Sequence, residues 1–589
     1  MKRTRLLIFP GLLVLIFLLG ACRQTTESDI TYDAANLQFS GEQAFALEEE
    51  FVNQFPDRAS GMPNVALSTK WLQEQFESYG LSCTTDEWEV TNFSETVPMK
   101  NVMCQLSGAS EREIIVMAHH DQSPQTVYGA DNDGSGIAII LHLAQLFAAE
   151  APGPYTLVFL ADDGEEYGML GSLRYIEQHP DPQRIIAAVS LDNVGKHFYD
   201  GIEMKSIGQF DGFGPPWLLQ AARDAAQVAV DAGDSTITVP VIRDPFTQVI
   251  DQAVPISLMD QGPLVAAGVP AFGFAGLVPP EFEDLHDQSY HTPGDTMELQ
   301  SPVILQETGR ATEALIRHLQ TMQTFPKEPA PYLYFAIDNN ILAGPILWLI
   351  FAVFVALFFI ASLWFGRKLP HGRSVGLRSA LPHFLGLWLP FVLSVISLYV
   401  MTALGLLQKF EQYFALARSP SYTDPRWPAV ILFLLGMAVF LYFGRKLTGL
   451  LQTTRPDFQS TKSLALFIIG LATLYIAIVN PFSLLLTIPL LFWLLISGRR
   501  GTAFALDILF FILGGTLLYY MMYTFGFVLL GINWYILWYI MMMMAVPMVG
   551  FATMTVICAI VAAGLSMIVR PPALTQEEKA APVEAVAES

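Results

Sequence analysis

The chain has 589 residues, of which 52% are hydrophobic, with a formal net charge of −22 at pH 7 and a mean hydropathy of +0.42. This composition is too apolar for an ordinary soluble protein. The acidic charge argues against nucleic acid as a partner, because phosphate binding needs clusters of Lys and Arg. Most acidic residues precede residue 340, and long apolar runs follow. We therefore expect an acidic soluble part joined to a membrane part.

The chain begins MKRTRLLIFPGLLVLIFLLGAC, with basic residues, a short apolar run and small residues before Cys22. This order is typical of an export signal, and LGAC resembles the lipobox of bacterial lipoproteins. That resemblance implies a signal peptide over residues 1–21 and lipid attachment to Cys22. An uncleaved anchor helix is the alternative, although the run is short for a span of about 20 residues. In either case we expect the next segment outside the cytoplasm, on a bacterial cell membrane.

Cys83 and Cys104 lie in two strand-like stretches on either side of the polar turn TNFSE. A hairpin could bring them together, and in an oxidising compartment they could pair. Two unpaired buried cysteines are the alternative, and the sequence leaves both open.

Strands and helices alternate between residues 113 and 192. The stretches EIIVMA, YTLVFLAD and IIAAVSL predict strands, and GIAIILHLAQLFAAE has the apolar spacing of a helix. The alternation predicts an α/β fold with a mostly parallel, mixed sheet flanked by helices. Functional groups gather beyond the carboxyl ends of such strands. The strand ends and one later loop supply these candidates: His119, Asp121, Glu165, Glu166, Asp192 and His291.

These residue types suit hydrolysis by one or two zinc ions. Imidazole nitrogen and carboxylate oxygen bind zinc, and a catalytic site keeps one position for water. A carboxylate that is not a ligand must then take the proton of that water. The adjacent Glu165 and Glu166 suit this division, one for the water and one for the metal. Asp121 could accept the second ring N–H of His119.

Four blocks resemble, in order, the zinc aminopeptidases of the M28 type: AHHD, GADNDGSG, DDGEEYGMLGS with LDNVG, and YHTPGDT. The resemblance covers roughly residues 45–322 and implies a zinc aminopeptidase-like fold acting on a peptide or protein substrate. The site that it implies has His119 and Asp192 on one zinc ion, Glu166 and His291 on the other, Glu165 as general base, and Asp121 orienting His119.

Two positions depart from the family. Asn132 stands where a single Asp bridges both metal ions, and a neutral amide bridges two zinc ions poorly. Three outcomes follow: a shift of register that brings Asp131 or Asp133 to the metals, a site with one zinc ion, or an inactive binding module. Asp260 and Gln261 stand where the family usually has Asp-His, and they are the candidate substrate contacts.

From residue 342 onward, apolar runs predict about eight membrane-spanning helices. They lie near residues 342–365, 383–406, 428–443, 463–479, 481–497, 503–524, 526–547 and 549–569. The loops GRKLPHGRSVGLRS, GRKLTGLLQTTRPDFQSTK and SGRR are basic and belong inside the cell, which agrees with an exported soluble part. Transport is the weaker hypothesis, because Asp507 is nearly the only acid within a span.

The predicted organisation is a signal peptide over 1–21, a peptidase domain over 22–335, an all-α polytopic membrane domain over 336–569 and an acidic, disordered tail over 570–589. The predicted function is that of an exported, bilayer-anchored zinc metallopeptidase that removes N-terminal residues. A glutaminyl cyclase-like enzyme and an inactive M28-like binding module are the alternatives.

Overall fold

The chain forms two compact units in the computed structural model, one reaching Leu347 and one beginning at Trp348. The predicted signal peptide with Cys22 and the predicted acidic tail lie outside the described residues. The structure describes residues 32–92, 95–209, 211–243, 245–253, 255–326, 334–337, 340–343, 345–367, 373–407, 426–487, 541 and 550–569.

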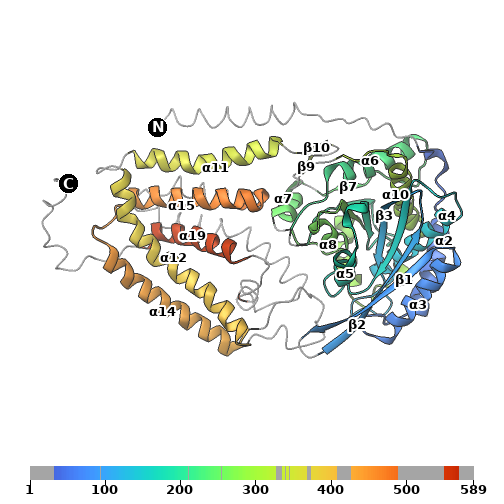
Figure 1. Cartoon of the computed structure of the whole chain (residues 1–589), viewed down its shortest axis with the longest axis horizontal. Coiled ribbons are helices and arrows are strands. Elements are labelled where there is room, and N and C mark those ends of the chain that lie inside the picture. The colour runs from blue at the N-terminus through green and yellow to red at the C-terminus, as the bar shows by residue number, and fades with distance from the viewer. Residues whose placement is uncertain are drawn as a thin grey trace. The chain divides into compact units, whose positions relative to one another are not determined.

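The first unit is built on an eight-stranded sheet in the order β1-β2-β4-β3-β5-β8-β6-β7 (Figure 1). Strands β4, β3, β5 and β8 run parallel at its centre, whereas β1 with β2, β2 with β4, and β6 with β8 pair antiparallel. The predicted α/β fold with a mixed sheet is confirmed. The strands are β1 (Ser82–Asn92), β2 (Glu95–Leu106), β3 (Ser110–His119), β4 (Tyr155–Asp162), β5 (Ile185–Leu191), β6 (Ile202–Lys205), β7 (Val241–Ile242) and β8 (Ala271–Gly276).

Helices cover both faces of this sheet, so its central strands are buried throughout. Figure 1 shows α5 and α8 on one face and α2 and α4 on the other. On the first face, Ile115 and Leu160 of the strands pack with Ile176 of α5 and Leu264 of α8. The helices are α2 (Gly41–Gln54), α3 (Pro63–Ser78), α4 (Gly136–Ala148), α5 (Leu170–Gln178), α6 (Pro216–Asp231), α7 (Pro245–Ala253), α8 (Gln261–Ala266), α9 (Glu283–Ser289) and α10 (Pro302–Thr321). A hairpin of β9 (Tyr334–Ile337) and β10 (Asn340–Ala343) ends the unit.

The hairpin β1–β2 carries a disulfide bond between Cys83 and Cys104, whose Cα atoms lie 4.1 Å apart. The two residues are register partners in the antiparallel pair. The alternative of two unpaired cysteines is therefore wrong.

We expect a double substitution, Cys83→Ala with Cys104→Ala, to lower the free energy of unfolding by about 3 kcal/mol. The bond joins residues 21 positions apart, and opening a loop of that size restores chain entropy to the unfolded state. Thermal unfolding of the full chain in detergent, without reductant, measures the loss. Cys558→Ala, which removes a buried free cysteine, is the control, and equal stability of wild type and double variant would contradict the expectation.

The second unit contains five helices that are long and apolar enough to cross a membrane. They match predicted spans and are α11 (Pro345–Gly366), α12 (Arg373–Ala403), α14 (Trp427–Leu451), α15 (Phe458–Val479) and α19 (Phe551–Ile568). Of the other predicted spans, residues 481–487 form the short helix η6 (Pro481–Thr487), and the rest lie outside the described residues apart from Met541.

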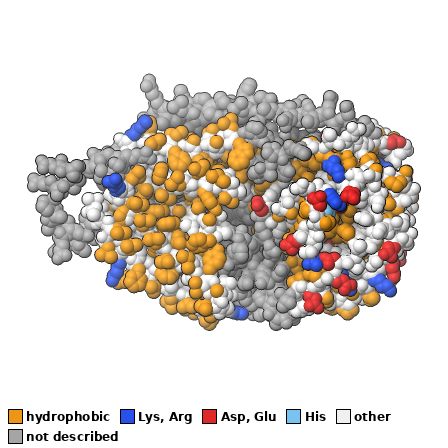
Figure 2. Space-filling model, viewed as in Figure 1, with side chains coloured by type: hydrophobic (Ala, Val, Ile, Leu, Met, Phe, Trp, Pro, Cys, Tyr) orange, Lys and Arg blue, Asp and Glu red, His pale blue; other side chains and the backbone are white. Residues whose placement is uncertain are grey.

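The core of this unit joins α11, α12, α15 and α19, where Phe358, Phe384, Leu466 and Ala562 pack together. Figure 2 shows hydrophobic side chains over most of its visible described face. Such a surface is suited to contact with lipid rather than water. The chain is therefore a membrane protein.

Candidate active site

The central strands deliver most of the predicted site residues at one edge of the sheet. His119 ends β3, Glu165 and Glu166 lie in the loop after β4, and Asp192 directly follows β5. The Nε2 atom of His119 lies 3.8 Å from Asp192 Oδ1 and 3.9 Å from Glu165 Oε2. His291, in the loop after α9, places its Nε2 atom 3.0 Å from Glu166 Oε1.

Asp121 connects His119 to the glutamate loop. Its Oδ1 atom lies 3.3 Å from His119 Nδ1, and its carboxylate accepts hydrogen bonds from the backbone N–H groups of Glu165 and Glu166, at 3.2 and 3.4 Å. Burial lowers the pKa of His119, but its bonds to Asp121 and Asp192 outweigh burial and hold that pKa well above its usual value. This environment favours a positive charge on the imidazole of His119.

Asn132 lies between the two pairs of candidate ligands. Its Oδ1 atom is 2.9 Å from His119 Nε2, and its Nδ2 atom donates a hydrogen bond of 2.6 Å to Glu166 Oε1. An ionised carboxylate has only acceptors, so the amide nitrogen must be the atom that faces Glu166. The amide thus divides the site into a His119 side, with Asp192 and the amide oxygen, and a His291 side, with Glu166 and the amide nitrogen.

The acids beside Asn132 are engaged elsewhere, so the shift of register weighed above does not occur. The Asp131 carboxylate accepts the backbone N–H of Gly195 at 2.8 Å. The two oxygens of Asp133 accept the backbone N–H groups of His119 and Gly136, at 3.2 and 2.9 Å. Neither acid can take the place of the bridging carboxylate in this arrangement.

Two glycines make the turn around Asn132 possible. Gly129 has a φ of +56°, and a Cβ atom on it would lie 2.7 Å from the carbonyl oxygen of Asn132. A Cβ atom on Gly136 would lie 2.5 Å from both oxygens of Asp133. Gly129 therefore leaves room for the carbonyl group of Asn132, and Gly136 for the carboxylate of Asp133.

The donor set fits one metal ion better than two. The His119 side offers an imidazole nitrogen, a carboxylate oxygen and an amide oxygen, all atoms that can coordinate zinc or a similar cation. The His291 side offers a carboxylate and an imidazole, but its third atom is an N–H donor that cannot be a ligand. Within the described part of the chain, no group of three or more His, Cys, Asp or Glu side chains is arranged to hold a metal ion, so the third donor on the His119 side is the amide oxygen of Asn132.

The model of the family described as Peptidase family M28 matches residues 101–316, a range that contains every residue of both sides of the site. The chain carries an M28 peptidase domain. The predicted recognition of this family, with a membrane region after the domain, is confirmed, and zinc is the metal that the family implies.

Curated relatives match parts of the M28 domain. The alkaline phosphatase isozyme conversion protein of Escherichia coli is 25% identical over 25% of this chain and 49% of its own length. A protein of Pyricularia oryzae described as a probable zinc metalloprotease is 30% identical over 25% of this chain and 32% of its own. The BOS complex subunit NCLN of Canis lupus familiaris is 27% identical over 20% of this chain and 22% of its own length. The chain spans about half or less of the length of these relatives.

Solved structures also resemble the M28 domain. Porphyromonas gingivalis glutaminyl cyclase is 22% identical, with a TM-score of 0.40, over 48% of this chain and 98% of its own. A zinc aminopeptidase from Bacillus subtilis is 14% identical, with a TM-score of 0.40, over 48% of this chain and 96% of its own.

Asp260 and Gln261, the candidate substrate contacts, lie inside the M28 domain with 1% of their surface exposed. Asp260 accepts a hydrogen bond of 2.8 Å from Ser172 Oγ, and burial raises its pKa to about 6. Gln261 donates to Ser257 Oγ at 3.1 Å. Because both side chains are buried, we do not propose that Asp260 or Gln261 contacts the substrate.

Arg58 is a supporting residue of the first unit that sequence reasoning missed. It is fully buried, and its guanidinium donates to the carbonyl oxygens of His120 at 3.0 Å and Gly129 at 2.6 Å. Arg58 thus fixes the backbone at both ends of the segment 121–128. Its sequence context, PDRAS, carries no motif that could have revealed it.

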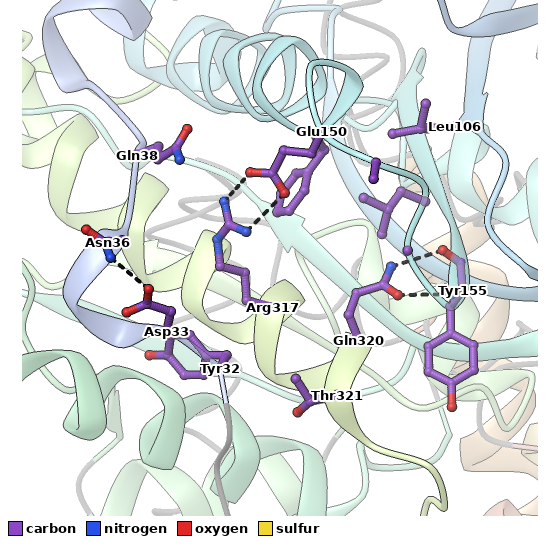
Figure 3. Close-up of a pocket in the computed structure, with 14 residues that line it drawn as sticks. Tyr32, Asp33, Asn36, Gln38, Leu106, Glu150, Tyr155, Arg317, Gln320 and Thr321 are labelled. Atoms are coloured by element: carbon purple, nitrogen blue, oxygen red, sulfur yellow. Dashed lines mark hydrogen bonds and ion pairs between the residues drawn. The ribbon is translucent and has the colours of Figure 1, made fainter.

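The first unit also contains a cavity of about 320 Å³ (Figure 3). Its polar side chains satisfy one another: Arg317 pairs with Glu150, and Gln320 bonds the backbone of Tyr155. None of the predicted site residues lines it, and we assign it no function.

His120 predicts how stability depends on pH. It is fully buried, with Nε2 donating to the carbonyl of Lys100 at 2.9 Å and Nδ1 lying 3.1 Å from Ser68 Oγ. Burial lowers its pKa to about 4, against about 6.5 in an unfolded chain. As pH falls, the unfolded state therefore binds the proton before the folded state does. The free energy of unfolding should fall by up to about 3 kcal/mol between pH 6.5 and pH 4.

Unfolding of the zinc-free chain, with chelator present, at pH 7 and pH 4.5 measures this effect. We expect His120→Gln to lose less stability than wild type between the two pH values. An identical loss in both proteins would show that His120 is not the titrating group.

Proposed function

We propose that the chain is an exported, membrane-anchored zinc aminopeptidase that releases N-terminal residues from peptides or proteins. One observation carries this proposal: the His119 side of the site joins three donor atoms for a metal to Glu165, a carboxylate that is free to act as a base. The family supports hydrolase chemistry, and the five apolar helices support attachment to a bilayer.

Glu165 is the residue we propose as general base. Its side chain is 10% exposed and its Oε2 atom lies 3.9 Å from His119 Nε2, so it borders the metal position and can face a substrate. Burial raises its pKa well above the usual range, and the charges of Asp192 and Glu166 add to this. A carboxylate with a raised pKa is a stronger base when it is ionised, and a zinc ion bound beside it would favour the ionised form.

In the proposed reaction, His119, Asp192 and the amide oxygen of Asn132 would hold zinc. When bound, zinc supplies Lewis-acid chemistry that polarises a peptide carbonyl and makes water a stronger nucleophile. Glu165 takes a proton from the attacking water and passes it to the departing amine. Asp121 keeps the imidazole of His119 in the orientation that presents Nε2 to the metal.

We further propose that the site holds one zinc ion. On the His291 side, Glu166 accepts from the Asn132 amide and pairs with His291, so these groups satisfy one another. No step of the proposed reaction requires a second ion there.

The proposed location of the M28 domain is the extracytoplasmic side of a bacterial cell membrane. The disulfide between Cys83 and Cys104 supports it, because such bonds persist in oxidising compartments. The basic loops between the apolar runs agree with it. Signal cleavage and lipid attachment at Cys22 stay predictions.

The test is peptide hydrolysis by the full chain, purified in detergent, with zinc or with chelator. We expect stepwise loss of N-terminal residues from peptides with a free amino end, and no change in peptides whose amino end is acetylated. A peptide beginning with Gln separates the cyclase alternative, which would release ammonia and no amino acid. Cleavage inside acetylated peptides would contradict the aminopeptidase assignment.

A non-catalytic binding module is the second candidate. It is favoured by Asn132, whose amide removes the bridging carboxylate, and by similarity to proteins that are named as subunits of a complex. This candidate predicts a folded chain that releases no amino acid at any zinc concentration.

A further inference from the structure

Asp295 joins two loops of the site through a single carboxylate. Its Oδ1 atom accepts the backbone N–H of Asp131 at 3.0 Å, and its Oδ2 atom accepts that of Asn132 at 3.1 Å. Asp295 is 1% exposed, and it stands four residues after His291 in the same loop. The carboxylate therefore fixes the backbone of Asn132 relative to the loop that carries His291.

Asp131 ties the same turn to a third loop. Its Oδ1 atom accepts the backbone N–H of Gly195 at 2.8 Å, and its Oδ2 atom accepts the hydroxyl of Tyr199 at 2.5 Å. The fully buried ammonium of Lys196 lies 3.3 Å from the same Oδ2 atom. These residues follow Asp192 along the chain, so Asp131 links the turn of Asn132 to the loop of Asp192.

The charges of this cluster are costly to bury. Burial raises the pKa of Asp295 to about 6, while Lys196 acts in the opposite direction. A buried group of ions commonly adds little net stability compared with apolar side chains of similar size. Stability alone is thus a weak reason for such a cluster, whereas fixing the relative positions of three loops is a direct consequence of its hydrogen bonds.

We propose that Asp295 and Asp131, neutralised by Lys196, are positioning residues that hold Asn132, Asp192 and His291 in one arrangement. Their bonds reach the backbone of Asn132 and of Gly195, three residues after Asp192, and Asp295 itself lies in the loop of His291. None of the positioning side chains is itself a proposed ligand. This inference rests on the proposed function, because the arrangement that it explains is that of the zinc site.

The test is Asp295→Asn in the full chain in detergent. The amide keeps one acceptor but turns an N–H donor toward a backbone N–H. Loss of an outer partner of a metal site commonly costs about 10–100-fold in metal affinity. We expect the Kd for zinc to rise by this factor, and amide hydrogen exchange to accelerate together in residues 129–135, 193–199 and 291–295.

Glu313→Gln is the matched control. Glu313 of α10 is fully buried and, like Asp295, accepts two backbone N–H groups through one carboxylate, from Gln38 at 2.9 Å and Phe39 at 2.8 Å. We expect this variant to lose stability without a change in zinc affinity. Tyr199→Phe removes one hydroxyl only, and it tests the cluster should Asp295→Asn fail to fold; we expect a weaker rise in the zinc Kd.

The outcomes separate the inference from the proposed function. If wild type, Asp295→Asn and Tyr199→Phe bind zinc equally well, the positioning role is wrong while the zinc site stands. If Glu313→Gln weakens zinc binding as much as Asp295→Asn does, the effect is one of general stability and the inference fails. If wild type binds no zinc, the proposed function and the inference on its zinc site both fall.

Discussion

Replacing Glu165 by Gln should lower the release of amino acids by at least about 100-fold and leave zinc bound. Gln has nearly the shape of Glu but cannot take a proton from water, and a general base commonly contributes about 10²–10⁴-fold to the rate. We therefore expect kcat to fall by about 10²–10⁴-fold. The Kd for zinc should stay within about threefold of the wild-type value, because Glu165 is not among the proposed zinc ligands.

Steady-state hydrolysis of a free-amino peptide and equilibrium dialysis against zinc measure the two effects on one preparation. Glu177→Gln is the matched control, since Glu177 is an exposed residue on α5 and its substitution should change neither value. Undiminished release by the Glu165→Gln chain would remove Glu165 from the mechanism.

We expect Asn132→Asp to raise the number of bound zinc ions from the proposed one to two. The substitution replaces the N–H that donates to Glu166 with an oxygen, so the His291 side gains the third ligand that it lacks. Without metal, the new carboxylate would face Glu166 within a buried, acidic site, and like charges there repel. We therefore expect chelator to lower the unfolding temperature of this variant more than that of wild type.

Elemental analysis of the full chain after dialysis gives the zinc content directly. Asn53→Asp makes the same change at an exposed position of α2, away from the candidate ligands, and should leave the content at one. Two ions in wild type, or one in Asn132→Asp, would show that the direction of the Asn132 amide does not set the metal count.

Much of the fold could be predicted from local sequence. Apolar runs mark β3, β4 and β5 because these strands are buried on both faces, and polar residues directly after them mark the ends of the strands. Parallel strands share one edge for their carboxyl ends, so the pattern alone places His119 and Asp192 at the same edge of the sheet. The direct pairing of β3 with β5, which brings the two residues together, is seen only in the fold. The apolar run near 383–406 predicts only part of α12, because the helix already begins at Arg373. The basic residues of its first turns lower the hydropathy of that segment.

The orientation of the Asn132 side-chain amide could not be predicted in the same way. The sequence shows an amide in place of an acid, but the direction of that amide depends on Glu166 and His119, which lie far from it along the chain. The roles of Asp131 and Asp133 likewise depend on partners such as Gly195, whose backbone N–H only the folded chain brings near. Asp295 was visible in the block YHTPGDT, yet nothing in its spacing indicated that it accepts from the backbone of another loop.

Zinc titration of the metal-free full chain, with peptide release followed in the same samples, tests the central claim most directly. The proposed single-zinc aminopeptidase predicts that release from a free-amino peptide begins with the first zinc added and reaches its maximum at one equivalent per chain. No release at any zinc concentration from a folded chain would contradict an enzymatic function, and a maximum only at two equivalents would contradict the single-ion site.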